Sequence, residues 1–234
     1  MEVAGIMTEL QGMGSESIKK ILLKHGVKEP FFGVKVEHLK TIQKKVKKDY
    51  QLAKDLFATG NADAMYLAGL IADDEKMTKA DLQTWADEAV SNNISEYTVP
   101  WVAAEGSHGF ELALEWINDN REHVAATGWS TLGDVVALKP DSELDIEALR
   151  ALLKRVEQTI HSSPNRVRST MNGFIISMGT YVAPLTDEAI ATANKVGLVM
   201  VDKNGTACKT PLAADYIAKA KARGPVVKKK TVKC

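Results

Sequence analysis

The chain has 234 residues with 30 basic and 30 acidic side chains, so its formal net charge is zero. Hydrophobic residues make up 45% and charged residues 26%, which is a globular composition and excludes a disordered polypeptide. No stretch approaches the roughly eighteen apolar residues of a membrane span, and the first residues lack the lysines of a signal peptide. We therefore predict a cytoplasmic protein without membrane contact. The two cysteines, Cys208 and Cys234, predict neither a disulfide framework nor a metal site.

Apolar residues recur at helical spacing along most of the chain, whereas the alternation typical of a half-buried strand is nearly absent. Ser15 is a good N-cap for a first helix that ends at Gly26, and a helix from Val36 has an apolar stripe opposite a row of lysines. Further helices are predicted at residues 51–59, 62–72, 78–89, 107–118, 122–138, 145–161, 165–182, 187–196 and 211–222. Thr78 is the expected cap of the fifth helix, and Pro211 is the expected first residue of the last one.

About eleven helices, roughly two for every forty residues, indicate an all-α fold. Short connections between them are typical of antiparallel helical hairpins, so we predict an α-solenoid of HEAT-like helix pairs. We expect residues 1–223 to form a single helical-repeat domain. Residues 224–234 begin with Gly224-Pro225 and carry four lysines and no acid, so we expect a basic disordered tail.

Charge is distributed unevenly along the chain. Residues 1–50 hold ten lysines against six acids, residues 51–165 hold eight bases against twenty acids, and residues 166–234 hold twelve bases against four acids. In a curved array both basic ends could face one concave groove, which would be a footprint for a polyanion. The alternative is that these charges are solvated faces of amphipathic helices, and charge alone does not decide between the two.

Several catalytic motifs are absent. The segment 205–210 (GTACKT) resembles a phosphate-binding loop, but Cys208 stands where that loop requires glycine, and no strand precedes it. The histidines share no metal-ligand spacing, and the Gly-x-Ser-x-Gly sequence of serine hydrolases is missing. We therefore predict no metal and no cofactor.

Arginines open the helix that is predicted after Pro164. Backbone N–H groups at a helix N-terminus and guanidinium groups can bind a phosphate together. The candidate nucleic-acid-binding residues are Arg166, Arg168, Asn172, Trp129, Lys209, Lys228, Lys229 and Lys230. The alternatives stay open: a large aromatic residue such as Trp129 is more often a core residue, and the arginines could pair with neighbouring acids.

Excision of a damaged base would require a carboxylate that activates water or stabilises a cationic sugar. Glu96, Glu105 and Asp134 are the candidates, and Glu96 is the first choice for a catalytic residue. Glu96 also lies near a predicted helix start, where a carboxylate complements the helix dipole without any catalytic role. That structural role is the more common one.

Several segments resemble the DNA alkylation repair family. They are residues 32–42 (FGVKVEHLKTI), 53–57 (AKDLF), 64–68 (AMYLA), 164–168 (PNRVR), 171–174 (MNGF) and 206–209 (TACK), and together they span nearly the whole chain. The resemblance implies a HEAT-like α-solenoid that holds duplex DNA on a concave, basic face. Active members of this family hydrolyse the glycosidic bond of N-alkylated purines without a metal and without flipping the base into a pocket.

The sequence departs from the family at its catalytic positions. The family's Trp-Asp-x-x-Asp-like run matches residues 94–98, so Ile94 takes the place of the tryptophan and Thr98 that of the catalytic aspartate. The catalytic arginine falls near Ala125 or Ala126, and the second groove tryptophan near Asn172 or Gly173. None of these residues can perform the same chemistry.

These departures put glycosylase activity in doubt and leave DNA binding as the main prediction, since function depends on the site and not on the fold. Two alternatives remain. One is a metal-independent glycosylase that uses Glu96 or Asp134, and the other is a catalytically silent helical scaffold that binds a protein partner.

Overall fold

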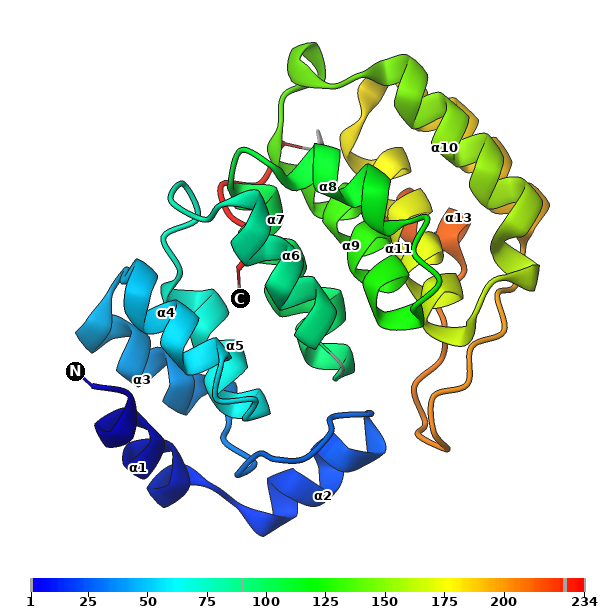
Figure 1. The fold of residues 1–234 in the computed structure, drawn as a ribbon. Helices are drawn as coiled ribbons and strands as arrows, with labels where there is room; N and C mark the ends of the chain where they lie inside the picture. Colours follow the sequence, from blue (N-terminus) through cyan, green and yellow to red (C-terminus); the bar gives the residue numbers. More distant parts are fainter. Residues whose placement is uncertain (1, 90, 225–226, 234) are drawn as a thin grey trace.

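The computed structural model describes residues 2–89, 91–224 and 227–233 (Figure 1). These residues form thirteen α-helices, one π-helical turn (η1) and three 3₁₀ turns, and they contain no β-strand. The elements are α1 (Val3–Met13), α2 (Glu16–Lys24), α3 (Val36–Val46), α4 (Tyr50–Phe57), α5 (Ala62–Ile71), α6 (Lys79–Glu88), η1 (Ile94–Thr98), α7 (Val99–Glu105), α8 (Gly109–Trp116), α9 (Glu122–Leu138), η2 (Asp141–Glu143), α10 (Ile146–Thr159), η3 (Ile160–Ser162), α11 (Asn165–Tyr181), η4 (Ala183–Leu185), α12 (Thr186–Val196) and α13 (Ala213–Lys221).

The predicted helices lie close to the expected bounds, and α9 has the predicted bounds. No helix was predicted for residues 94–105, where η1 and α7 form. Thr78 caps α6 as expected: its hydroxyl accepts from the backbone N–H of Asp81, and the Asp81 carboxylate accepts from the backbone N–H of Thr78. The sequence patterns predict no element in residues 1–14, yet α1 forms there and buries Ile6 and Leu10. Pro211 precedes α13 by two residues instead of opening it.

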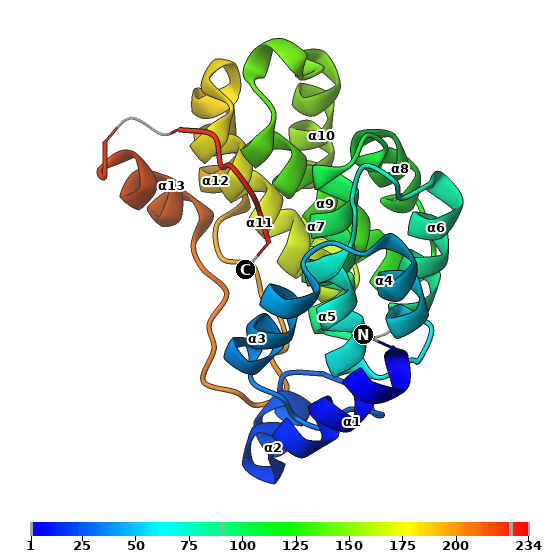
Figure 2. The ribbon, with the colours of Figure 1, turned by 90° about the vertical axis from the view of Figure 1, so that its left-hand side faces the viewer.

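The helices are arranged in two layers (Figures 1 and 2). What we call the inner layer consists of elements that pack side by side in the order α3, α5, η1 with α7, α9, α11 and α13. Helices α4, α6, α8, α10 and α12 form the outer layer. In Figure 2 the two ends of the array project toward the side of the inner layer, so this layer lines a concave face, called the inner face below. The predicted all-α solenoid of HEAT-like pairs is confirmed.

The apolar core consists mainly of two clusters. One joins residues of α1 and α3–α8, and the other joins residues of α8–α13. Helix α9 belongs to both, because Val124 packs in the first cluster and Trp129 in the second. Helix α9 is thus held on both sides, which fixes the position of its neighbours η1, α7 and α11.

The C-terminal segment differs from the disordered tail that its composition predicts. Residues 227–233, called the tail below, run along the inner face (Figure 2). The backbone N–H of Lys229 donates to the carbonyl of Ala137 at 2.8 Å, and that of Val232 donates to Oε1 of Glu105 at 2.8 Å. Acids of the inner face and free carbonyls bind the tail, which composition alone does not show. Residues 225, 226 and 234 of the expected tail lie outside the described residues.

Candidate nucleic-acid interface

The two layers differ in charge. The five outer helices together carry six basic and ten acidic residues, whereas the six inner α-helices carry seven basic and six acidic residues. The connection 197–212 between α12 and α13 adds two lysines and one acid on the inner side, and the tail adds four lysines. The inner layer together with this connection and the tail is therefore more basic than the outer layer.

Four lysines surround one hollow of the inner face, between α3 and the tail. Lys44, Lys47, Lys48 and Lys233 contribute to its lining, and its volume is about 500 Å³. Lys48 and Lys233 both bind the carboxylate of Asp74, at 3.3 and 2.6 Å. Lys44 and Lys47 are exposed, and in the described part of the chain neither ammonium group makes a hydrogen bond or ion pair. Two ammonium groups are thus available to phosphates at this end.

Glu96, the candidate catalytic acid, lies in η1 and is bound by an arginine of α11. Arg166 donates from Nε and Nη2 to the two carboxylate oxygens of Glu96, whose side chain is 5% exposed. Burial acts to lower the pKa of Arg166, but the hydrogen bonds and charge of Glu96 outweigh burial and raise it. The backbone N–H of Arg166 also donates to Glu122, at 2.6 Å. The pair joins η1 to α11, so Glu96 is not presented as a free acid and Arg166 is not a free phosphate ligand.

The other candidates on α9 and α11 lie in or near the core. Trp129 is fully buried, with its ring centre 5.3 Å from that of Phe174, so it offers no open face for stacking. Asn172 is also buried and donates from Nδ2 to the carbonyl of Pro211 at 3.0 Å, which ties α11 to the segment before α13. Arg168 is partly buried, and its Nε has no partner among the described residues. Among these residues, Nε of Arg168 and the indole nitrogen of Trp129 are buried donors without a partner in the described chain.

The candidate lysines follow the inner side of the C-terminal half. Lys209 is exposed and makes no hydrogen bond or ion pair within the described ranges. Lys228 is partly buried and pairs with Asp141 at 2.8 Å. Lys229 and Lys230 are exposed. The structure thus leaves three of these four ammonium groups open to solvent on one side of the molecule.

A further lysine, Lys203, lies close to Arg166. Its Nζ donates to Oγ of Ser169 at 3.2 Å. Burial lowers the pKa of Lys203, and the positive charge of Arg166 lowers it further. A phosphate bound beside the two cations would relieve their repulsion. Lys203 was not among the residues predicted from the sequence, because its neighbour Arg166 comes from a different helix pair.

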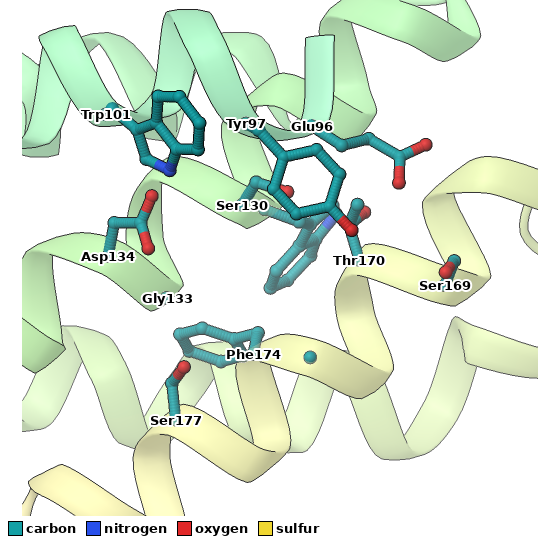
Figure 3. A pocket seen from close by; sticks show the side chains of 12 residues that line it. Glu96, Tyr97, Trp101, Ser130, Gly133, Asp134, Ser169, Thr170, Phe174 and Ser177 are labelled. Atoms are coloured by element: carbon teal, nitrogen blue, oxygen red, sulfur yellow. The ribbon is translucent and has the colours of Figure 1, made fainter. Parts of the chain in front are cut away.

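A pocket of about 210 Å³ opens on the inner face between η1, α7, α9 and α11 (Figure 3). The rings of Trp129 and Phe174 form part of its apolar wall. Three rows of residues, each with a spacing of four that places its members on one side of a helix, also line it. The rows are Tyr97 and Trp101; Ser130 and Asp134; and Ser169, Gly173 and Ser177.

The residues that the sequence matched to the family's catalytic positions mostly lie elsewhere. Ile94 and Thr98 are 0% exposed and belong to the core, as do Ala125 and Ala126. Residues 94–98 form a π-helical turn, which is wider than an α-helical turn and alters the direction of the side chains that follow. Tyr97 and Trp101 reach the pocket instead. Among the matched positions, Gly173 does line the pocket.

Asp134, the other acid considered for catalysis, contributes its carboxylate to the pocket, and the indole nitrogen of Trp101 points toward it (Figure 3). Asp134 makes no hydrogen bond or ion pair with any residue that the structure describes. Burial raises the pKa of its carboxyl to about 7. The positive charge of Lys229 acts to lower this pKa, and the negative charge of Glu105 acts to raise it. Near neutral pH the group is therefore poised between its neutral and charged forms.

Sequence reasoning missed Tyr97, Ser130 and Ser177 as site residues. A usable signal was present, because polar or aromatic residues recur at a spacing of four within helices that are otherwise apolar. The signal identifies one face of each helix. It does not show that the three faces meet.

Comparisons with known proteins agree with this architecture. Residues 6–213 match the model of a family described as DNA alkylation repair enzyme. An uncharacterized protein of Listeria innocua, Lin0241, is 32% identical over 222 residues, which cover 92% of this chain and 96% of that protein. Lmo0209 of Listeria monocytogenes, also uncharacterized, is 31% identical over the same coverage.

A solved structure is similar over 100% of both chains, with a TM-score of 0.92 and 35% sequence identity. It represents a new family of proteins related to the HEAT-like repeat DNA glycosylases, with affinity for branched DNA structures. In the present chain, none of the described helices has the length and apolar character needed to cross a membrane. The family match over most of the chain and the similarity of the whole fold lead to one conclusion: this chain belongs to the DNA alkylation repair enzyme family.

Proposed function

We propose that this cytoplasmic protein binds duplex and branched DNA along its inner face and does not excise alkylated bases. The observation that carries the proposal is the polarity of charge between the layers, with an acidic outer layer and lysines of α3, the 197–212 connection and the tail on the inner side. A phosphate backbone gains affinity from such a surface by releasing its counterions. Branched DNA is included because the solved relative has affinity for it.

The absence of excision follows from the state of the candidate acid. A general base must reach water or substrate with a free oxygen, and both oxygens of Glu96 accept hydrogen bonds from Arg166. Asp134 retains free oxygens, and a pKa of about 7 suits a general base at neutral pH, so it is the acid whose replacement tests this part of the proposal. Because the buried Thr98 stands where active members of the family carry their catalytic aspartate, we expect purified protein to release no N-methylated base from methylated duplex DNA, and release that disappears in Asp134→Asn would overturn this part of the proposal.

Binding is tested by titrating the protein with a duplex and with a four-way junction over a range of salt concentrations. We expect the affinity to fall steeply with salt, because each phosphate contact contributes about −0.9 to the slope of log K against log salt. The double variant Lys44→Glu/Lys209→Glu removes two exposed ammonium groups of the inner face, and its slope should be smaller by about two.

Lys154→Glu is the matched control for that variant. Lys154 is an exposed lysine of α10 in the outer layer, and it makes no hydrogen bond or ion pair with a described residue. We expect this change to leave the salt slope within error of the wild type. Equal losses in the two variants, or an affinity that does not depend on salt, would contradict binding on the inner face.

A protein partner is the second candidate function, because several large apolar side chains are exposed in and beside the 197–212 connection. They are Leu198, Met200, Leu212 and Tyr216, which are 42–67% exposed. Exposed apolar groups close together are typical of protein contact sites. This function would gain support if Leu198→Ser/Met200→Ser abolished capture of a defined partner while the DNA affinity stayed constant.

A further inference from the structure

The pocket of Figure 3 has the size of a site for one small ring system. Its volume of about 210 Å³ lies below the roughly 300–1,000 Å³ of pockets that hold drug-sized ligands. It opens on the inner face, which is the face that the proposed function assigns to DNA. A ligand in this pocket would therefore be part of, or attached to, the bound nucleic acid.

The walls of the pocket suit a flat, aromatic ligand. Tyr97 is 53% exposed, and its ring centre lies 6.2 Å from that of Trp101. Trp101 is held in place by an edge contact with Tyr66, at 5.3 Å between ring centres. Aromatic side chains that are fixed in this way provide a surface on which a base can stack, whatever its sequence context.

Polar groups in the pocket lack partners within the described chain. Neither the carboxyl of Asp134 nor the hydroxyls of Ser130 and Ser177 form a hydrogen bond to a described residue. The indole nitrogen of Trp129 is buried and also unpartnered. The oxygens of Asp134, Ser130 and Ser177 belong to partly exposed residues, so water binds them in the empty pocket, and a ligand with matching groups would displace that water.

Gly173 lines the pocket and is exposed, so a larger side chain at this position would lie at the edge of the pocket. It lies inside α11, where glycine stabilises a helix less than alanine does. A Cβ atom at this position would meet nothing within 4 Å, so packing does not require glycine. The missing side chain is explained if a ligand passes close to this part of the helix.

We propose that this pocket receives one unstacked nucleobase of bound DNA, stacked on Tyr97 and hydrogen-bonded to Asp134. The inference rests on the proposed function and adds the chemical class that the pocket recognises. A neutral carboxyl offers a donor and an acceptor side by side, which matches the ring nitrogen and amino group of adenine or cytosine. Branched DNA supplies such bases, because pairing is interrupted at the branch point.

The test compares two duplexes that differ in one bulged nucleotide, which carries either adenine or no base. The measured quantity is the ratio of the two dissociation constants. For the wild-type protein we expect the adenine bulge to bind about tenfold more tightly, as stacking of one base on an aromatic ring permits. In Gly173→Leu a leucine side chain closes the entrance, and in Tyr97→Ala the stacking surface is gone, so both ratios should fall to about one.

Gly5→Leu is the matched control, because Gly5 lies inside α1 and a Cβ there also meets nothing within 4 Å. Its ratio should equal that of the wild type. Asp134→Asn retains a donor and an acceptor and should keep most of the preference, whereas Asp134→Leu should lose it. A Gly173→Leu variant that retains the tenfold preference would overturn the proposal.

The outcomes for the wild type separate this inference from the function on which it rests. Salt-dependent binding to the paired duplex, with no preference for the bulged base, would overturn the pocket proposal and leave DNA binding intact. An absence of binding to every DNA would overturn both.

Discussion

Two carboxylates line the same pocket, and their surroundings are opposite. Glu96 is 5% exposed and both of its oxygens are bound by Arg166. Asp134 has no partner in the described chain, and burial raises its pKa to about 7. A charge that is removed from water must be paired or neutralised. Glu96 is paired with Arg166, whereas Asp134 is largely neutralised by its raised pKa. Replacing Glu96 should therefore destabilise the folded protein, and replacing Asp134 with a neutral residue should stabilise it.

The largest effect is expected from Glu96→Ala. The variant leaves the guanidinium of Arg166, whose side chain is 20% exposed, without its carboxylate. Removal of one partner of a buried ion pair costs about 3–5 kcal/mol in the free energy of unfolding. Urea unfolding at pH 7.5 measures the loss. A loss below about 1 kcal/mol would show that solvent screens the pair and that the two sites do not differ in kind.

The double variant Glu96→Leu/Arg166→Met is the control for this loss. It removes both charges, so no unpaired ion remains between η1 and α11. Apolar replacement of a whole buried pair is often neutral or stabilising. We expect the double variant to be more stable than Glu96→Ala, which would assign the loss to the uncompensated charge of Arg166.

The opposite sign is expected for Asp134→Asn. The folded pKa of about 7 exceeds the unfolded value of about 3.9, so the folded chain keeps a proton that the unfolded chain releases. The contribution of Asp134 to the free energy of unfolding of the wild type is fully present below about pH 4 and is lost as the pH rises toward 7. The variant lacks this loss and should be more stable than the wild type by about 2–4 kcal/mol at pH 8. Equal stability of the two proteins at pH 8 would remove the contrast with Glu96.

A smaller effect is expected from Glu188→Ala in the outer layer. Arg150 donates from Nε to both oxygens of Glu188 at 2.9 Å, so a guanidinium again contacts both carboxylate oxygens, as in the Glu96 pair. These side chains are 40% and 46% exposed, and solvent screens exposed pairs, so the loss of stability should be much smaller than for Glu96→Ala. Thermal unfolding of this variant beside Glu96→Ala isolates the effect of burial. Similar losses in the two variants would mean that geometry, and not burial, sets the contribution.

The smallest effect is expected from Lys229→Ala. The positive charge of Lys229 acts to lower the pKa of Asp134, so its removal should raise that pKa further. A carboxyl carbon titration followed by NMR measures the change. Lys230→Ala is the control, because it removes the next lysine of the same tail without changing a charge that acts on Asp134. If both variants shift the titration equally, the tail acts through its total charge and not through one contact.

The sequence predicted the helices well because their signals are local. The apolar stripe of α3 and the capping box of Thr78 and Asp81 involve residues within a few turns of each other. It missed α1, whose apolar residues Ile6 and Leu10 are buried only because α3, α4 and α5 provide a surface for them. The position of the tail was missed for the same reason. Its contacts with Glu105 and Asp141 join residues about ninety to 130 positions apart, which a local pattern does not show.

The candidate site was predicted only in part. The arginine pair and the lysines were identified as charges, but the sequence could not show that Arg166 is bound to Glu96, seventy residues away. Trp129 was named for stacking and is buried, since the packing of α9 between two clusters decides its exposure.

By itself, the sequence determined the helical class, the spacing of the helix pairs and the family resemblance, because periodicity and local motifs are properties of neighbouring residues. Only the tertiary structure decided that the lysines of the tail lie beside the inner layer, that Glu96 is paired and that Asp134 is not. Those properties depend on which helix faces meet, and burial and charge partners are set by residues that are distant in the chain.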